Sequence, residues 1–306
     1  MGDSVIMRNK TVTIFFSLLM LAAAGVAILA GADAMAAEGM AKPWQLNFQE
    51  PVTPVMKELY QMHYWLVVLI TVVSVFVLAL LLYVCVRFRK AANPVPSKNT
   101  HNTIVEIVWT VVPVIILIGI AIPSFRLHFD CIHSIGCTED GTPVDPDLTL
   151  KVIGYQWYWN YEYPEHEIQF DSYMKKEEDL LEGEPRLLAV DNPIVVPVNA
   201  NVRVLVTGGD VIHAWAMPAF GVKQDTVPGR LNETWFRAEK EGTYYGQCSE
   251  LCGRLHGFMP IHVEVVDQAF YDQWIAAAKD DMEAASKLVA EYRGRGPNQF
   301  AETTNQ

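Results

Sequence analysis

The sequence predicts a two-helix transmembrane hairpin followed by an all-β barrel or sandwich, with a helix at the C-terminus. Two apolar stretches before residue 128 are each long enough to cross a bilayer. Short runs that alternate apolar and polar residues then extend from residue 148 to residue 266, as in half-buried strands. From residue 267 the alternation gives way to a helical period, which predicts the final helix.

The composition agrees with a membrane protein that also has a water-exposed domain. Of the 306 residues, 51% are apolar and only 19% are charged, and this apolar excess is best placed in membrane segments. The formal net charge of -12 argues against nucleic acid as a partner and favours a basic partner.

An apolar stretch near the N-terminus predicts a secretory signal peptide over residues 1–36. Arg8 and Lys10 precede this stretch, and small residues follow it. A basic region, an apolar stretch and an A-x-A site are the three parts of a signal peptide. We expect cleavage after Ala36, so that residues 37–60 form an exported N-terminal segment. An uncleaved membrane anchor is the alternative.

The next two apolar stretches predict the transmembrane hairpin, residues 61–128. The first span, about residues 64–86, carries no charge, and at 1.5 Å per residue it is long enough for a hydrocarbon core of about 30 Å. The second span, about residues 104–125, contains Pro113 and Pro123. Membrane helices tolerate proline where neighbouring groups satisfy the freed backbone.

The loop between the spans, residues 87–103, determines the predicted topology. It carries four basic residues and no acidic one, so the positive-inside rule places it in the cytoplasm. The N-terminal segment, the linker loop at residues 129–147 and everything after it then lie on the outer side. This orientation agrees with the signal peptide, which exports the N-terminus.

The exported part of the chain divides into a β domain and a C-terminal tail. Over residues 148–266, β-rich runs recur about every ten residues between Gly, Pro and Asn, as in a β-sandwich or barrel. Over residues 267–306 we expect a helix with one apolar face, followed by a polar tail.

A cluster of soft metal ligands lies near the end of the β domain. Cys248, Cys252, His256 and Met259 fall within twelve residues. Thiolate, thioether and imidazole groups suit copper, and a blue-copper site uses one Cys, two His and a weak Met. The second Cys gives enough ligands for two metal ions that share two sulfurs. Because loops at one end of a β-sandwich lie close together, His213 can join this cluster.

Three other interpretations of Cys248 and Cys252 stay open at this point. Exported cysteines commonly pair in a disulfide. Structural zinc takes four tetrahedral ligands but makes no use of Met. A redox or copper-delivery motif on a thioredoxin-like fold needs βαβ units nearby, whereas the pattern around these residues is strand, loop, strand.

The combined features resemble subunit II of the haem–copper cytochrome c oxidases, over roughly residues 55–280. The resemblance rests on the two spans and on the string H…C-S-E-L-C-G…H-G-F-M-P around the metal ligands. The aromatic run Gly154–Tyr163 and the run Phe220–Arg230 match as well. The resemblance implies a cupredoxin-like β domain that carries two copper ions in a dinuclear copper A centre.

The resemblance also implies a role for each ligand. Cys248 and Cys252 would bridge both copper ions, His213 and Met259 would complete the shells, and His256 would bind the second metal. In addition, Glu250 would offer its backbone carbonyl to copper and its carboxylate to a magnesium ion shared with the catalytic subunit. Carboxylate oxygen suits that hard ion better than it suits copper.

Further residues take roles from the resemblance. Trp157 would be the residue through which electrons enter, although aromatics at this density usually fill a core. Glu106, in the setting T-H-N-x-x-x-E, would stand at the entrance of a proton path, with His101 nearby; alternatively it only reaches the membrane interface. Acidic residues would dock basic cytochrome c, or would be ordinary solvated charges: Glu162, Asp171, Asp191, Asp210 and Asp225.

The function implied by the resemblance is that of an electron-transfer subunit of cytochrome c oxidase, an oxidoreductase that translocates protons. Electrons from a soluble or membrane-anchored cytochrome c would pass through copper to haem in catalytic subunit I, which reduces oxygen to water. This chain has no CxxCH motif, so we expect no haem in it and assign the enzyme activity to the complex. The other oxidase subunits and membrane lipid are further expected partners.

The signal peptide and N-terminal extension are typical of bacterial members of this family. We therefore expect a multi-pass protein of the bacterial inner (plasma) membrane, with the copper domain in the periplasm. The copper A domain of a nitrous-oxide-reductase-like protein is the main alternative, but that class is soluble and carries a propeller. A quinol-oxidase subunit would be a structural scaffold that lacks the copper ligands.

Two cysteines remain once the copper pair is assigned. Cys131 and Cys137 lie in an exported loop, where a disulfide between them is the favoured interpretation. Metal binding together with His128 and His133 is the alternative.

Overall fold

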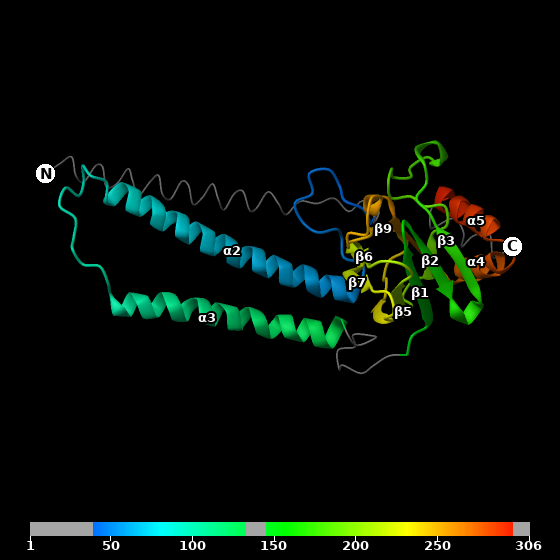
Figure 1. The fold of residues 1–306 in the computed structure, drawn as a ribbon, viewed down its shortest axis with the longest axis horizontal. Coiled ribbons are helices and arrows are strands. Elements are labelled where there is room, and N and C mark those ends of the chain that lie inside the picture. Colours follow the sequence, from blue (N-terminus) through cyan, green and yellow to red (C-terminus); the bar gives the residue numbers. More distant parts are fainter. Residues whose placement is uncertain (1–38, 133–144, 296–306) are drawn as a thin grey trace. The chain divides into compact units, whose positions relative to one another are not determined.

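The computed structural model of the protein describes residues 39–132 and 145–295 (Figure 1). The predicted signal peptide and the Cys131–Cys137 pair lie outside the residues whose side chains are described. Within the described residues a helical hairpin comes first, a β domain follows, and two helices come last. This order of elements is the predicted one.

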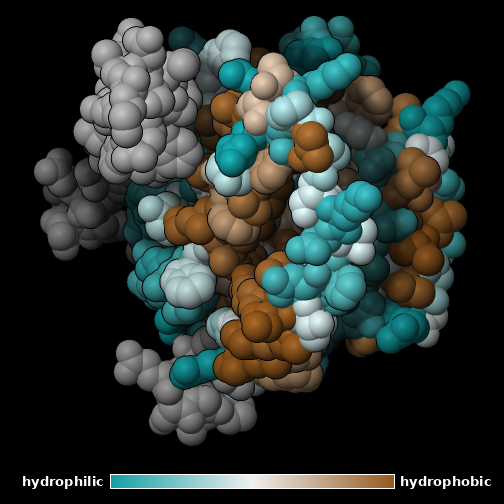
Figure 2. Space-filling view, turned by 90° about the vertical axis from the view of Figure 1, so that its left-hand side faces the viewer, coloured by the Kyte–Doolittle hydropathy of each residue, from teal (hydrophilic) through white to brown (hydrophobic). Residues whose placement is uncertain are grey.

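Two long helices form the hairpin, α2 (Pro54–Arg87) and α3 (Thr103–Arg126). Both are long and apolar enough to cross a membrane, and no part of their most apolar windows is buried within the chain. Figure 2 views the molecule from the side at which α2 ends and α3 begins, and shows brown apolar side chains on this face. Such extended apolar surfaces require a lipid or protein environment.

Capping residues determine where the two helices begin. The Thr53 hydroxyl accepts a hydrogen bond from the backbone N of Met56 at 3.0 Å, and Pro54 occupies the first helical position. Because this cap starts the helix, α2 begins well before the apolar run at about residue 64. The Asn102 side chain caps α3 in the same way, with two backbone N–H groups as donors.

The β domain contains two main sheets and one small one. The strand order is β3-β2-β1-β5-β8 in the five-stranded sheet, β4-β10-β9 in the three-stranded sheet and β6-β7 in the two-stranded sheet. The strands of the first sheet are β1 (Leu148–Tyr155), β2 (Tyr158–Tyr163), β3 (Ile168–Ser172), β5 (Val202–Gly208) and β8 (Asn232–Phe236). The others are β4 (Ile194–Pro197), β6 (His213–Met217), β7 (Val222–Thr226), β9 (Gly242–Gln247) and β10 (Pro260–Val266).

The sheets pack as a sandwich around an aromatic core, as predicted. β1 pairs in parallel with β5, and β10 pairs in parallel with β4, while the partners β2 and β9 are antiparallel. The alternation predicted for β1 is observed, since Leu148, Leu150 and Val152 are buried and the residues between them are half-buried. The largest fully buried side chains include Trp159, Trp215, Trp274, Tyr161, Tyr163 and Phe220.

A pair of helices, α4 (Gln268–Asp280) and α5 (Met282–Arg295), stands where one C-terminal helix was expected. Asp281 lies between them in an extended conformation, and its carboxylate accepts a hydrogen bond from the backbone N of Glu283 at 2.9 Å. An aspartate in this position caps a new helix. The helical period continues across this break, so the period alone does not reveal it.

A set of polar and charged side chains, here named the Arg293 network, joins α5 to β9, β10 and the loop before β4. Arg293 Nε lies 3.0 Å from Glu264, and its Nη1 lies 2.9 Å from Glu184. Arg293 Nη2 donates to the hydroxyl of Tyr245 at 3.0 Å. The remaining members, each bonded to one of the two glutamates, are Lys175, Thr243 and His262.

The first turn of α2 is bonded to the β domain. Thr53 is fully buried, and its hydroxyl donates to the backbone carbonyl of Phe220 at 2.7 Å. The backbone N of Val52 donates to the carbonyl of Ala219 at 3.2 Å. Ala219 and Phe220 lie in the turn between β6 and β7. The residue that caps the membrane helix is therefore also a bond to the β domain.

Candidate metal centre

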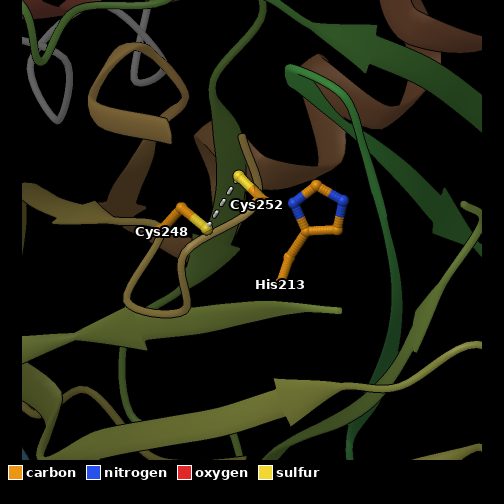
Figure 3. Close-up of side chains that lie close together, drawn as sticks. All are labelled: His213, Cys248 and Cys252. Atoms are coloured by element: carbon orange, nitrogen blue, oxygen red, sulfur yellow. Dashed lines mark hydrogen bonds between the residues drawn. The ribbon is translucent and has the colours of Figure 1, made fainter. Parts of the chain in front are cut away.

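Three soft ligands meet between β6 and the loop that joins β9 to β10. His213 is the first residue of β6, and Cys248 and Cys252 follow β9. One ligand atom from each residue lies within 4.8 Å of the other two, and all three residues are buried. Figure 3 shows the two thiols directed toward each other, with the imidazole beside Cys252. No other such group of His, Cys, Asp or Glu occurs among the described residues.

The remaining two predicted ligands join the same cluster. The two sulfur atoms are 3.9 Å apart and both thiols are free, whereas a disulfide brings sulfurs to about 2 Å. The disulfide interpretation of Cys248 and Cys252 is therefore wrong for this structure. Cys252 Sγ lies 3.5 Å from Met259 Sδ and 3.6 Å from His256 Nδ1. All five side chains predicted to bind copper thus come together.

Glu250 presents its backbone and its side chain differently. Its carbonyl oxygen lies 3.4 Å from Cys248 Sγ, so the backbone faces the sulfur atoms. The residue as a whole is exposed, and no hydrogen bond to its carboxylate lies within the described residues. This arrangement fits the predicted division between a copper-facing carbonyl and a carboxylate available to another subunit.

The orphaned nitrogen of His213 tests whether a metal ion fits this site. His213 Nδ1 is buried and has no hydrogen-bond partner among the described groups. An unpartnered buried polar atom costs free energy, and a metal ion that takes its lone pair removes that cost. Two thiols, a thioether and imidazole form a donor set for copper, and zinc would leave Met259 without a use.

The two thiols differ in acidity. Burial raises the pKa of Cys248, but the nearby His213 imidazole and contacts with the backbone at Ala214 and Glu250 lower it to about 7. Burial and the neighbouring Cys248 raise the pKa of Cys252 to about 12. One thiol therefore ionises near neutral pH on its own, and a bound cation would be required to deprotonate the second.

Three neighbours hold the His213 ring in place. Its Nε2 lies 2.9 Å from Asp210 Oδ1, which orients the imidazole within its plane. The Trp159 ring stands edge-on to it at a centroid distance of 5.9 Å. Gly154 on β1 faces the ring, and a Cβ at this glycine would lie 2.9 Å from His213 Cδ2. The space occupied by the imidazole thus exists because position 154 has no side chain.

Trp157 lies between the cluster and the surface. It is half-buried, and its indole Nε1 donates to the backbone carbonyl of Cys252 at 3.2 Å. The side chain of Gln156 donates to the same carbonyl at 2.8 Å. Gly253 allows this close packing, since a Cβ there would lie 3.1 Å from the Trp157 ring and the glycine has φ +118°. The tryptophan predicted to admit electrons is in direct contact with the backbone of Cys252, a predicted copper ligand.

Two of the five predicted docking acids are bound within the β domain. Asp191 accepts hydrogen bonds from the backbone N of Tyr173 and of Asn192, and burial raises its pKa. Asp210 accepts from the backbone N of Gln156 and of Val211 in addition to its contact with His213. Neither set of hydrogen bonds was predicted from the sequence. The spacing of three positions between Asp210 and His213 is the signal that indicates their contact.

The other three predicted docking acids make fewer bonds within the described chain. Glu162 forms an ion pair with Lys151 at 2.8 Å, and Asp171 accepts a hydrogen bond from the Asn160 side chain at 2.7 Å. Asp225 is exposed, and no bond to its carboxylate lies within the described residues. A free, exposed carboxylate is the kind of group that attracts a basic partner.

Glu106 lies in the first turn of α3, at the end of the hairpin away from the metal cluster. Its Oε1 accepts a hydrogen bond from the backbone N of Asn102 at 3.1 Å, so the carboxylate helps to cap the helix. His101 is exposed and contacts the Thr100 hydroxyl at 3.5 Å. The geometry thus gives Glu106 a structural contact in addition to the proton-path role that was predicted.

Two family models match the chain. The model described as cytochrome c oxidase subunit II, periplasmic domain, matches residues 148–266. The model described as cytochrome c oxidase subunit II, transmembrane domain, matches residues 41–127. Together they cover the hairpin and the β domain and leave the linker between them unmatched.

Curated relatives and a solved structure are similar to this chain. A probable cytochrome c oxidase subunit 2 of Rickettsia felis is 52% identical over 238 residues, which cover 77% of this chain and 72% of the relative. Cytochrome c oxidase subunit 2 of Zea mays is 46% identical over 242 residues, which cover 77% and 90% respectively. The crystallised periplasmic domain of subunit II of Bradyrhizobium japonicum cytochrome oxidase is 56% identical with a TM-score of 0.42, and covers 44% of this chain and 96% of that one.

Proposed function

Because the chain belongs to the cytochrome c oxidase subunit II family, we propose that it is the subunit of a haem–copper oxidase that accepts electrons from cytochrome c. It is a membrane protein with a periplasmic domain of the copper A type. In the proposed function, electrons pass on to haem in the catalytic subunit, where oxygen is reduced to water and protons are translocated. The chemistry of oxygen thus belongs to the complex, and this chain carries no haem.

One observation carries the proposal: two free thiols, a thioether and a buried imidazole with an unpartnered nitrogen converge on one point. We assign two copper ions to this point, held by Cys248, Cys252, His213, His256 and Met259, with the carbonyl of Glu250. When bound, the copper pair supplies reversible one-electron storage. The residues themselves keep water away, because the thiols, the thioether and the His213 ring are buried.

The surrounding residues limit how far the ligands move. The backbone N of Ser249 donates to the carbonyl of Ala214 at 3.0 Å, which ties the ligand loop to β6. The indole of Trp159 donates to the carbonyl of Met259 at 3.2 Å, which ties the other end of the loop to β2. A ligand set held from both sides rearranges little when charge changes, and small rearrangement favours fast electron transfer.

Electrons would enter at Trp157 and the acidic surface near it. Trp157 is half-buried and bonded to the backbone of Cys252, so it offers a covalent and hydrogen-bonded route from the surface to a ligand sulfur. Asp225, Asp171 and Glu162 leave carboxylate charge accessible for a basic cytochrome c. Complementary charge raises the rate of association and loses this effect as salt increases.

Two further assignments extend the proposal to the partner subunit. The exposed carboxylate of Glu250 would bind magnesium together with catalytic subunit I, since carboxylate oxygen suits that ion. Glu106 would stand at the entrance of the proton path on the cytoplasmic side, with His101 nearby. We further propose that the chain lies in the inner membrane of a bacterium, with its signal peptide cleaved and its copper domain in the periplasm.

The rival functions lose support for specific reasons. A nitrous-oxide-reducing enzyme is soluble, whereas the transmembrane family model matches residues 41–127. A quinol-oxidase scaffold lacks copper ligands, whereas all five side chains meet here. A thioredoxin-like copper-delivery protein needs βαβ units, whereas the ligand loop joins two antiparallel strands, β9 and β10.

Metal stoichiometry of the full chain tests the proposal. The chain is purified in detergent micelles, loaded with copper, and assayed for copper and zinc by elemental analysis and for unpaired electrons by electron paramagnetic resonance. We expect two copper ions per chain, with one unpaired electron spread over both. A single copper ion, or a preference for zinc, would overturn the assignment. Replacement of the exposed thiol in α2, Cys85→Ser, is the matched control and should leave the signal unchanged.

A further inference from the structure

We propose that Asp210 is a positioning residue of the copper centre, which orients His213 for metal binding and holds the Trp157 loop against Cys252. This inference rests on the proposed copper function. It differs from the role that resemblance implies for Asp210, which is to dock cytochrome c on the protein surface.

The first argument is the contact between Asp210 and His213. Asp210 Oδ1 lies 2.9 Å from His213 Nε2, the imidazole is fully buried, and one third of the aspartate side chain is exposed. A carboxylate on one ring nitrogen draws the proton to that nitrogen and leaves the other as a lone pair. The other nitrogen, Nδ1, is the buried atom that has no partner among the described groups. The aspartate therefore selects the tautomer that a metal ion requires.

The second argument is that the same carboxylate holds the neighbouring loop. Asp210 Oδ2 accepts a hydrogen bond from the backbone N of Gln156 at 2.8 Å. The Gln156 side chain donates to the carbonyl of Cys252 at 2.8 Å, and the Trp157 indole donates to the same carbonyl at 3.2 Å. One side chain thus links the His213 ligand, through Gln156, to the backbone of the Cys252 ligand.

The third argument is that these contacts leave little of Asp210 for a partner. Both of its oxygens are occupied, Oδ1 by His213 and by the backbone N of Val211, and Oδ2 by Gln156. Asp225 offers the contrast, since its carboxylate has no bond within the described chain.

The experiment compares Asp210→Ala and Asp210→Asn with Asp225→Asn in the full chain, loaded with copper in detergent micelles. Copper affinity is measured by competition with a chelator, and the electronic absorption and paramagnetic resonance of the centre are recorded. The reduction potential is measured by titration. The association rate with cytochrome c is measured as a function of salt concentration.

We expect Asp210→Ala to lower copper affinity by about 10–100-fold, as removal of a carboxylate behind a metal-binding His typically does. The absorption spectrum should change, and the potential should rise because the imidazole donates less charge to the oxidised metal. These effects should be independent of salt. Asp225→Asn should show the opposite pattern: an unchanged spectrum and affinity, and an association rate that falls most at low salt.

A docking role would produce a different result. If Asp210→Ala and Asp210→Asn keep the affinity, spectrum and potential of the unmodified chain and slow only salt-dependent association, the positioning role is wrong. If Asp210→Ala fails to fold, Asp210→Asn decides the question, since its amide fills the same volume but cannot accept at both positions. If the unmodified chain binds no copper, the proposed function fails and not this inference alone.

Discussion

The metal cluster and the Arg293 network are both buried and polar, but only in the network does each charged group have its partner within the chain. Every charge in the network faces an opposite charge or a hydrogen-bond partner, and the side chain of Glu264 is only 3% exposed. In the cluster, two thiols lie 3.9 Å apart without a bond, and His213 Nδ1 has no partner.

The difference between the two regions separates structure from function. Buried polar groups in proteins are nearly always paired, so a cluster that is left open indicates a missing ligand. His262 Nδ1 is also unpartnered, but its other nitrogen is bound to Glu264 and no group of three ligands forms around it in the described chain. An unpartnered buried polar atom therefore indicates a ligand site only where several soft donors lie close together.

The largest expected effect is the loss of the copper centre. Cys252→Ser should abolish the shared copper signal, because Cys252 is the residue that contacts Cys248, His256 and Met259 at once. The apoprotein should keep its circular dichroism spectrum, since no bond of the Arg293 network is touched. A variant that still binds two copper ions with a shared electron would show that the cluster is not the site.

The next largest effect concerns the closed network. Arg293→Met should destabilise the β domain by about 3–5 kcal/mol, because it leaves the buried Glu264 without a Lys or Arg partner and Glu184 with Lys175 alone. Denaturant unfolding of the full chain in micelles, followed by tryptophan fluorescence, measures this loss. Arg203→Met is the matched control: its ion pair with Glu233 is exposed and should contribute less than about 1 kcal/mol. Equal losses in the two variants would contradict the comparison.

A smaller effect is expected from added volume beside His213. In Gly154→Ala the new methyl group would lie 2.9 Å from His213 Cδ2 and 3.0 Å from the Trp159 ring, so the imidazole must shift. Copper affinity should fall by about 10-fold, the lower end of the range for a disturbed ligand orientation. Gly257→Ala lies in the ligand loop but has open space around its Cβ, and should leave the affinity unchanged.

The smallest effect is a pH dependence that originates in the Arg293 network. Burial lowers the pKa of His262 below its ordinary value of 6.5, although the contact with Glu264 opposes this change. Below about pH 6.5 His262 therefore binds a proton more readily in the unfolded chain than in the folded chain, so the free energy of unfolding falls as the pH drops. Melting temperatures of the apoprotein between pH 5.5 and 7.5 should show this slope, and His262→Asn should flatten it. An identical slope in the variant would exclude His262 as the origin.

Local patterns in the sequence predicted much of this structure. The spans and the alternating strands are each visible within a short window, so they were predicted correctly, and the string from Cys248 to Met259 is visible in the same way. That His213 joins this cluster was also expected, because loops at one end of a β-sandwich meet. Contacts between residues far apart in the chain do not fall within such a short window. Examples are Gln156 with Cys252 and Glu184 with Arg293, separated by 96 and 109 positions.

Two further features needed the three-dimensional structure. Asp210 was predicted as a surface charge, and only the fold shows its carboxylate between His213 and the Gln156 backbone. The C-terminal helix was expected to be continuous, but Asp281 in an extended conformation divides it into α4 and α5. In both cases a short polar side chain makes a local bond that sequence periodicity does not register.

The two hydrogen bonds of the Thr53 hydroxyl have a mechanical consequence for the protein. A membrane helix can accommodate a change in bilayer thickness by changing its tilt. Here the hydroxyl that accepts from Met56 also donates to Phe220, and the helix of 34 residues extends from this joint. A tilt of α2 must therefore either break the hydrogen bond from Thr53 to Phe220 or move the turn between β6 and β7. Strand β6 begins with His213. The thickness of the lipid bilayer is thus mechanically connected to the strand that begins with His213, a predicted ligand of the metal.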